Sequence, residues 1–306
     1  MGKLVDLIIT KLSKGRNRWF AVTAVIVLFG SLYFYHAEVP QVLPQSAIYS
    51  LNDAATPTQG QKVLVFSPHP DDETIGVGGY IAQSRREGAD VRIVLVTDGN
   101  KHHNEAIRYS EFKKATAILG VTESNLVFLN FPDGKLREQD ESTLYNALKE
   151  QIDLYNPDIV IYPHPRDANP DHSTIGRIVE GIVKTESSKR TAYEYLVHYE
   201  LLYPRPRKFA PNLYLLPPKS ILSFDKEWRR FPLPQEIEDL KMTATFTYKS
   251  QLNDPWLHGL LLSSIRRNEL LAIPKDVDTH GQSPWHFTGQ ASLDLNPGVP
   301  AISHTQ

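Results

Sequence analysis

The chain has 306 residues and nearly balanced charge, with 33 Lys and Arg against 35 Asp and Glu. It contains no cysteine, which excludes disulfides, thiolate metal sites and cysteine nucleophiles. Any bound metal must therefore be held by nitrogen and oxygen ligands. A net charge of -2 shows no basic excess, so nucleic acid is not an expected partner.

Residues 19–36 differ from the rest of the chain in composition. The run from Trp19 to Tyr35 carries no charge and approaches the roughly 20 apolar residues of a membrane helix. Residues 1–18 carry five basic side chains and one acidic one, which favours a cytoplasmic N-terminus. We predict a single-pass cell-membrane anchor with the C-terminal domain outside the cytoplasm. A cleaved secretory signal remains the alternative, although no small-residue cleavage site follows the run.

Three further segments are distinguished by composition. Residues 37–61 are rich in Pro, Gln, Ser, Thr and Ala without periodicity, which predicts a linker. The folded domain is expected at 62–272. Residues 273–306 mix Pro, Gly, Ser and His without a pattern, so we expect a loosely structured tail.

The first half of this domain alternates short apolar runs with amphipathic segments. The expected strands are 63–66, 91–97, 126–129 and 159–162, and the expected helices are 74–86, 105–119, 143–154 and 173–183. Such alternation predicts an α/β domain with a mainly parallel sheet between two helical layers. Beyond residue 190 the pattern weakens. There we expect strands at 193–199 and 213–216 and helices at 233–251 and 261–271.

The segment from Ser67 to Glu73, SPHPDDE, directly follows the first expected strand. Open α/β sheets bind ligands at such strand ends. His69 and Asp72 could both reach one divalent cation, which would leave Asp71 free to act as a base. A pair of aspartates at a helix start is otherwise most often a cap.

A second cluster follows the fourth expected strand, in the run from Pro163 to Thr174 (PHPRDANPDHST). A catalytic zinc usually has three protein ligands and an open position, and His172 supplies the third. A single histidine in a Pro-rich loop is usually solvated. Two clusters at two strand ends of one parallel sheet favour a shared metal site formed by His69, Asp72 and His172.

The ordered motifs of the chain are similar to those of the PIG-L/LmbE-like family of zinc-dependent N-deacetylases. The motifs that carry the resemblance are His69-Pro-Asp-Asp72, Thr97-Asp-Gly99, Arg108-x-x-Glu111, Phe131-Pro-Asp-Gly134, Pro170-Asp-His172, Tyr248-Lys-Ser-Gln251 and Arg267-Asn-Glu-Leu270. The resemblance extends over about 62–272.

The resemblance implies a Rossmann-like fold and removal of the N-acetyl group from an N-acetylated amino sugar, such as a GlcNAc-type glycan, glycolipid or glycoconjugate. It implies that Zn²⁺, or another divalent metal such as Fe²⁺, is held by His69, Asp72 and His172. Asp71 is then the general base that accepts a proton from the attacking water.

Position 169 departs from the family pattern, because Asn169 stands where the family commonly has a histidine. An asparagine amide can donate a hydrogen bond to an oxyanion but cannot act as an acid. His164 could take that role, or Asp71 could return its proton to the amine. Arg108 is expected to bind substrate, with a surface pair to Glu111 as the alternative. Asp171 is expected either to orient a histidine or to cap a helix.

Two other functions remain open from the sequence. One is a zinc-containing glycan-binding protein with weak or no catalysis, because of Asn169. The other is a zinc amidase for a non-sugar amide. A dinucleotide site is not expected, because Gly76, Gly78 and Gly79 lie about ten residues beyond the strand rather than in its turn. These glycines are expected to let a helix pack closely.

Overall fold

The computed structural model describes residues 17–38, 43–101, 104–185, 190–200, 203–222 and 226–274. The expected tail at 273–306 lies outside these residues except for its first two positions. The basic segment at 1–18 lies outside them except for Asn17 and Arg18.

A single eight-stranded sheet runs through the described domain, in the order β1-β7-β8-β6-β5-β2-β3-β4. The strands are β1 Asn52–Asp53, β2 Lys62–Ser67, β3 Asp90–Thr97, β4 Leu126–Phe131, β5 Ile159–Pro163, β6 Thr191–Tyr195, β7 Lys226–Pro232 and β8 Asn268–Pro274. All neighbouring pairs are parallel except those that β8 forms with β6 and β7. The predicted mainly parallel α/β fold is confirmed.

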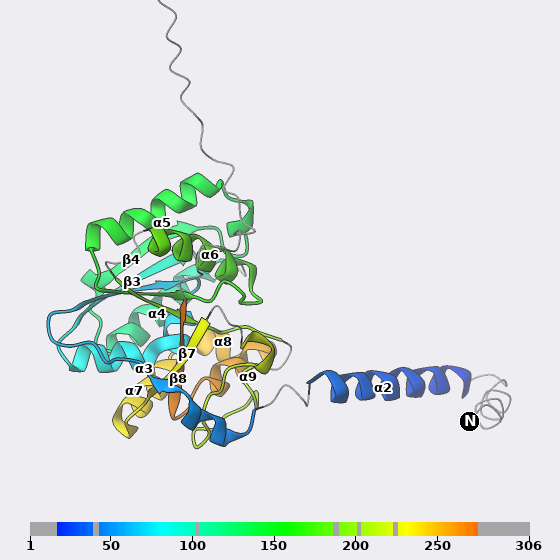
Figure 1. Ribbon diagram of the computed structural model, residues 1–306. Helices are drawn as coiled ribbons and strands as arrows, with labels where there is room; N and C mark the ends of the chain where they lie inside the picture. The colour runs from blue at the N-terminus through cyan, green and yellow to red at the C-terminus, as the bar shows by residue number, and fades with distance from the viewer. Residues whose placement is uncertain are drawn as a thin grey trace, which may run out of the picture. The chain divides into compact units, whose positions relative to one another are not determined.

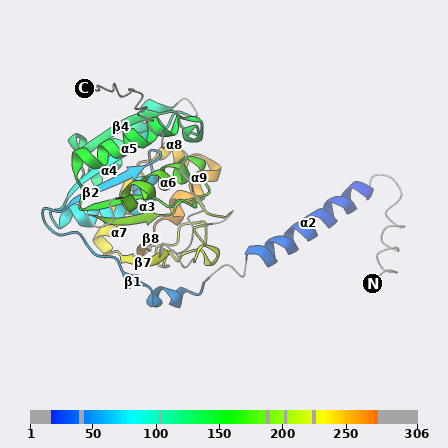
Figure 2. The ribbon, with the colours of Figure 1, turned by 45° about the horizontal axis from the view of Figure 1, so that its top comes forward.

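Helices cover both faces of this sheet, with α5 and α6 on the side opposite α3 and α4 (Figures 1 and 2). The α-helices are α2 Asn17–Glu38, α3 Asp72–Arg86, α4 Glu105–Ile118, α5 Glu141–Tyr155, α6 Pro170–Thr185, α7 Gln235–Thr245, α8 Lys249–Leu252 and α9 Pro255–Ser263. Short 3-10 segments are η2 Gln45–Ser50, η3 Glu123–Asn125, η4 Leu136–Glu138 and η5 Lys219–Ile221.

Strand β2 has alternate side chains in two separate cores. Val63 and Val65 pack in the core that includes side chains of α3 and α4, whereas Leu64 and Phe66 pack in the core that includes those of α5 and α6. Burial on both faces is why the strand reads as a continuous apolar run. Strand β2 is thereby fixed between both layers.

The order in which successive strands join the sheet reverses at β2. Strands β3 and β4 follow on one side of β2, and β5 and β6 on the other. The carboxyl ends of β2 and β5 therefore lie side by side, with Val65 opposite Ile161. This is the switch point at which α/β sheets form a ligand-binding crevice.

Helix α3 packs closely on its neighbours through glycines. A Cβ atom at Gly76 would lie 2.4 Å from the Tyr195 ring, and one at Gly79 would lie 2.4 Å from Leu233 Cδ2. The expected packing role is confirmed for Gly76 and Gly79, whereas a Cβ at Gly78 would make only ordinary contacts of 3.5 Å or more. The helix is interrupted at Val77 (φ -143°, ψ 24°), and the Glu269 carboxylate accepts hydrogen bonds from the Gly79 and Tyr80 amides there, both at 2.7 Å.

The second half of the domain differs from its prediction. Residues 213–216 are not a strand, while β7 was missed because its charged sequence, KEWRRFP, obscures the apolar positions. The predicted helix at 261–271 is wrong, because α9 ends at Ser263 and the next apolar run forms β8. Short apolar runs do not distinguish helix from strand by periodicity. The predicted helix at 233–251 is two helices, α7 and α8.

The linker predicted at 37–61 is wrong for residues 45–53. Segment η2 buries Ile48, and β1 pairs in parallel with β7 at the sheet edge. One apolar residue among polar ones left no periodic signal. The predicted anchor segment, 19–36, is helical within α2. Within the residues that the structure describes, no helix is long and apolar enough to cross a membrane.

Candidate metal centre

The turn after β2 is built by the carboxylates that follow it. Asp71 has a φ of 130°, a strained conformation for a residue with a Cβ atom. The Asp72 carboxylate accepts a hydrogen bond from the His69 amide at 3.0 Å. Glu73 is fully buried, where its carboxylate accepts hydrogen bonds from Ser67 Oγ at 3.2 Å and from the Tyr248 hydroxyl. The turn is thus tied to the strand end and to the residue that precedes α8.

The turn after β5 is built by a helix cap. Asn169 Oδ1 accepts a hydrogen bond from the Asp171 amide at 2.9 Å, as an N-cap side chain does. Pro170 is the first residue of α6, a position that proline favours because its fixed φ suits the helix start. The first turn of α6 then contains Asp171 and His172, both buried.

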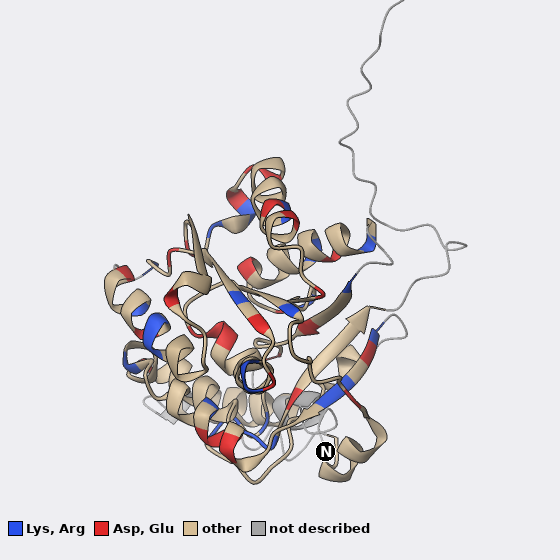
Figure 3. Cartoon of the chain, turned by 90° about the vertical axis from the view of Figure 1, so that its left-hand side faces the viewer, with Lys and Arg blue, Asp and Glu red and all other residues tan. Residues whose placement is uncertain are grey.

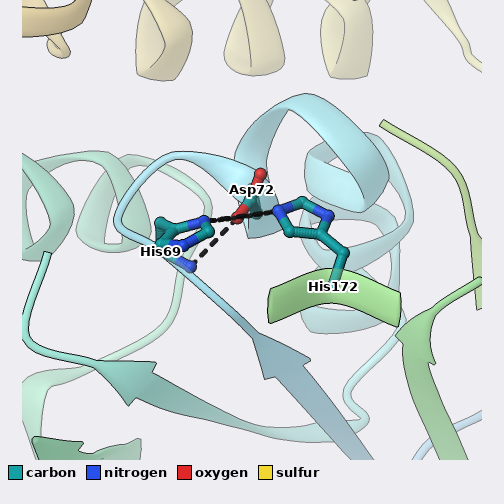
Figure 4. A group of neighbouring side chains, drawn as sticks. All are labelled: His69, Asp72 and His172. Atoms are coloured by element: carbon teal, nitrogen blue, oxygen red, sulfur yellow. Dashed lines mark hydrogen bonds and ion pairs between the residues drawn. The ribbon is translucent and has the colours of Figure 1, made fainter. Parts of the chain in front are cut away.

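The two turns bring His69, Asp72 and His172 together, as predicted (Figure 4). Asp72 Oδ2 lies 3.0 Å from His69 Nδ1 and 2.9 Å from His172 Nε2. The two ring nitrogens are 3.3 Å apart. Zinc bonds of about 2.0–2.1 Å in tetrahedral geometry place ligand atoms roughly 3.3 Å apart, so these separations fit one metal ion.

Carboxylates also face the outer nitrogens of both imidazoles. His69 Nε2 lies 3.1 Å from Asp171 and 3.3 Å from Asp133, and His172 Nδ1 lies 3.3 Å from Asp167. A carboxylate can only accept a hydrogen bond, so it favours the proton on the outer nitrogen. The inner nitrogens then direct lone pairs at each other and at Asp72, an arrangement typical of metal-binding histidines.

The electrostatic field of the site favours positive charge. Burial lowers the pKa of His172, but Asp72 and Asp167 raise it to about 9. Burial likewise opposes the charged form of His69, while Asp133, Asp171 and Asp72 hold its pKa well above the ordinary value. Away from this site, acidic and basic residues are interspersed along the described part of the chain (Figure 3). The residues present therefore fit a divalent cation.

Asp71 lies beside this group and is held by Arg108. Arg108 is buried, donates to the Pro70 carbonyl at 2.8 Å, and has Nη2 3.4 Å from Asp71 Oδ2. Burial raises the pKa of Asp71 to about 8, against the lowering effect of Arg108. A carboxylate in this environment is suited to accept a proton near neutral pH.

The structure distinguishes between the alternatives that the sequence left open for Arg108 and Asp171. The alternative pair between Arg108 and Glu111 is wrong, because Glu111 accepts hydrogen bonds from Ser250 instead. Arg108 contacts Asp71 and Asp133, and its substrate role stays a prediction. Asp171 faces His69, so the histidine-orienting alternative matches the geometry.

The prediction that His164 reaches the substrate needs correction. Its ring is 1% exposed, stacks on Trp228 with centroids 5.7 Å apart, and accepts a hydrogen bond from the Arg166 amide. Burial lowers the pKa of His164 to about 3. This ring therefore presents neither an accessible edge nor a cation.

Sequence reasoning assigned no role to Glu73, Asp133 or Asp167. Asp133 lies in the Phe131–Gly134 motif, and Asp167 precedes Asn169 in the Pro-rich run. Each is a carboxylate near a strand end, the one signal that could have found them. Their contacts join segments distant in sequence, so spacing alone does not identify their partners.

The chain is similar to several known sequences. Residues 64–183 match the PIG-L family, described as GlcNAc-PI de-N-acetylase. The chain is 34% identical over 131 residues to a diacetylchitobiose deacetylase of Thermococcus kodakarensis, covering 38% of this chain and 46% of that protein. It is 28% identical over 130 residues to a probable N-acetyl-alpha-D-glucosaminyl L-malate deacetylase 2 of Bacillus subtilis, covering 39% and 59%.

A longer match is to a mycothiol S-conjugate amidase of Streptomyces coelicolor, 26% identical over 262 residues and covering 73% of this chain and 85% of that protein. The first curated relatives are matched over less than two thirds of their own length, between 46% and 63%.

Solved structures share the fold. The N,N'-diacetylchitobiose deacetylase of Pyrococcus horikoshii superposes with a TM-score of 0.51 at 21% identity, covering 80% of this chain and 92% of that one. The conserved protein TT1542 of Thermus thermophilus gives 0.53 at 23% identity, covering 73% and 98%. Residues 64–183 thus match a PIG-L family domain, and the deacetylases of similar sequence are consistent with that match.

Proposed function

We propose that this protein is a metal-dependent hydrolase that removes the N-acetyl group from an N-acetylated amino sugar. The observation that carries the proposal is the convergence of His69 Nδ1, Asp72 Oδ2 and His172 Nε2, with pairwise separations of 2.9–3.3 Å. Asp71 lies beside them and is outside the ligand group, as a general base requires. Two imidazoles and one carboxylate are a ligand set typical of catalytic zinc.

A bound zinc ion supplies Lewis acidity and lowers the pKa of a coordinated water toward roughly 7. Side chains of the protein carry out the proton transfer and orient the reacting groups. Asp71 accepts a proton from the attacking water, and Arg108 orients the Asp71 carboxylate. Asp167 and Asp171 keep the outer nitrogens of His172 and His69 protonated, so that their inner lone pairs stay directed at the metal.

Asn169 has a limited role under this proposal. Its Oδ1 is engaged in the cap of α6, which leaves the amide N–H groups free to donate. A donor of this kind can stabilise the oxyanion that forms at the acetyl carbon. It cannot protonate the leaving amine, so Asp71 returns its captured proton to that nitrogen.

The class of substrate is taken from the relatives. The names of the Thermococcus and Bacillus proteins specify deacetylation of an N-acetylated sugar or sugar conjugate. We propose a GlcNAc-type glycan, glycolipid or glycoconjugate for this chain. A non-sugar amide is the second candidate; the similarity to the Streptomyces amidase supports an amide other than an N-acetyl group.

We also propose that residues 19–36 anchor the protein in the cell membrane, with the catalytic domain outside the cytoplasm. The support comes from the sequence, namely the charge-free run from Trp19 to Tyr35 and its basic flank, because no helix within the described residues is long and apolar enough to cross a membrane. Large apolar side chains of α2 are exposed, including Trp19, Phe20 and Phe29. Protease added to intact cells should digest the domain and spare residues before Trp19; complete protection would reverse this topology.

The activity is tested by acetate release from a panel of N-acetylated sugars and glycoconjugates by the purified protein, with and without chelator. The matched control is Asp72→Asn, which removes a ligand charge without changing side-chain size. The proposal predicts release that chelator and Asp72→Asn both abolish. Zinc binding without release from any panel member would favour a glycan-binding protein or an amidase for another substrate.

A further inference from the structure

His198 lies at the same edge of the sheet as the metal centre. It follows β6, which pairs in parallel with β5 so that Tyr195 is opposite Pro163. The His198 amide donates to Asp167 Oδ2 at 3.0 Å, and its carbonyl accepts from the Ala168 amide at 2.8 Å. These two contacts fix the segment after β6 against the turn that carries His172.

The ring of His198 meets that of His172 edge to face, with centroids 4.7 Å apart and planes at 82°. Its buried Nδ1 lies 3.4 Å from Asp167 Oδ1, at ion-pair distance but without a hydrogen bond. Because the carboxylate only accepts, it favours the tautomer that has the proton on Nδ1. The lone pair of His198 is then on Nε2, on the opposite side of the ring.

His198 is also more accessible than the imidazoles around it. Its side chain is 25% exposed, against 10% for His69 and 0% for His172. Among the described histidines at this edge it alone combines contact with a proposed ligand and an accessible ring. Because Nδ1 is buried, the exposed area belongs to other atoms of the side chain.

We propose that His198 contacts the substrate, with Nε2 accepting a hydrogen bond from an O–H or N–H group next to the scissile acetamido carbon. The proposal rests on the deacetylase function above and deepens it. It assigns to the end of β6 an imidazole that the family commonly supplies at position 169, where Asn169 caps α6. The substrate class is an N-acetylated amine that carries such a donor, as amino sugars do.

The test compares two variants of the full-length protein, loaded with zinc and assayed for acetate release. His198→Asn keeps a polar atom near the place of Nδ1 and loses the Nε2 contact. His198→Gln keeps a polar atom near the place of Nε2. Losing one hydrogen bond to substrate should lower kcat/KM of His198→Asn roughly tenfold, while His198→Gln should recover most of the loss. Zinc content should equal that of the wild type in both.

Several results would overturn the assignment. Wild-type kcat/KM in His198→Asn would remove His198 from substrate contact. Loss of zinc or of folded protein in that variant would assign the residue to support of the metal site instead. Equal losses of kcat/KM in both variants, with wild-type zinc content, would rule out a substrate contact through Nε2. A wild-type protein that releases no acetate in the same assay would instead count against the proposed function itself.

Discussion

His69 Nδ1 and His172 Nε2 face each other at 3.3 Å across the Asp72 carboxylate. Each histidine has a carboxylate on its outer nitrogen, Asp171 for His69 and Asp167 for His172. Two lone pairs directed at one another repel unless a cation lies between them. The residues thus form a site that fits a divalent cation, and the predictions below examine its parts.

Asp71→Asn tests the general base. Asparagine has nearly the same size and tolerates the positive φ of position 71, so fold and zinc content should be unchanged. Removing a general base typically costs about 10²–10⁴-fold in rate, and kcat should fall by that order. The measurement is acetate release with parallel zinc analysis; wild-type turnover would remove Asp71 from the mechanism.

Asp171→Asn tests the carboxylate behind His69. The amide cannot hold the outer nitrogen in its protonated tautomer as firmly, so metal affinity should fall about 10–100-fold. Competition with a zinc-binding dye measures this directly. The matched control is Asp153→Asn on α5, whose side chain pairs with Lys149 at the surface. Equal zinc affinity in the two variants would contradict a supporting role for Asp171.

Lys241→Met tests the buried pair that holds the break in α3. Lys241 Nζ lies 2.6 Å from Glu269 Oε1, and both side chains are at most 1% exposed. Leaving one buried charge without its partner costs about 3–5 kcal/mol, so the free energy of unfolding in urea should fall by that amount. Arg86→Ala, which breaks the exposed pair with Glu236, should cost less than about 1 kcal/mol. Similar losses of unfolding free energy in both variants would show that burial does not determine the cost of breaking an ion pair.

Glu194 gives a prediction about pH. Burial raises the pKa of Glu194 to about 7 from its ordinary value of 4.5, although Lys226 opposes the shift. Between these values the folded protein retains a proton that the unfolded chain has released, so the free energy of unfolding falls as pH rises. Glu194→Gln should flatten this fall between about pH 4.5 and 7. A wild-type slope in the variant, measured by urea unfolding at several pH values, would assign the dependence to other groups.

The sequence was sufficient to predict the proposed ligands because their signal is local. His69 and Asp72 follow a buried strand within a few residues, and His172 opens a helix after another. Parallel strands joined by right-handed crossovers bring such ends to one edge. Because β2 and β5 are neighbours in the sheet, the motif after β2 and the motif after β5 form one site.

The supporting residues could not be predicted in the same way. Asp133 and Asp167 reach histidines across turns whose geometry depends on packing, and the contact of His198 with His172 depends on where β6 ends. Strand β8 pairs with two strands in antiparallel fashion, and its apolar sequence was equally compatible with a helix. Non-local pairing is the shared reason that these features were missed.

Zinc content per chain tests the central claim most directly. Purified wild-type protein and His172→Ala should be loaded with zinc, freed of excess metal and analysed by mass spectrometry. The account predicts one zinc per wild-type chain and strong depletion in His172→Ala, because the remaining two ligands bind zinc weakly. Full zinc occupancy in His172→Ala, or none in the wild type, would contradict it.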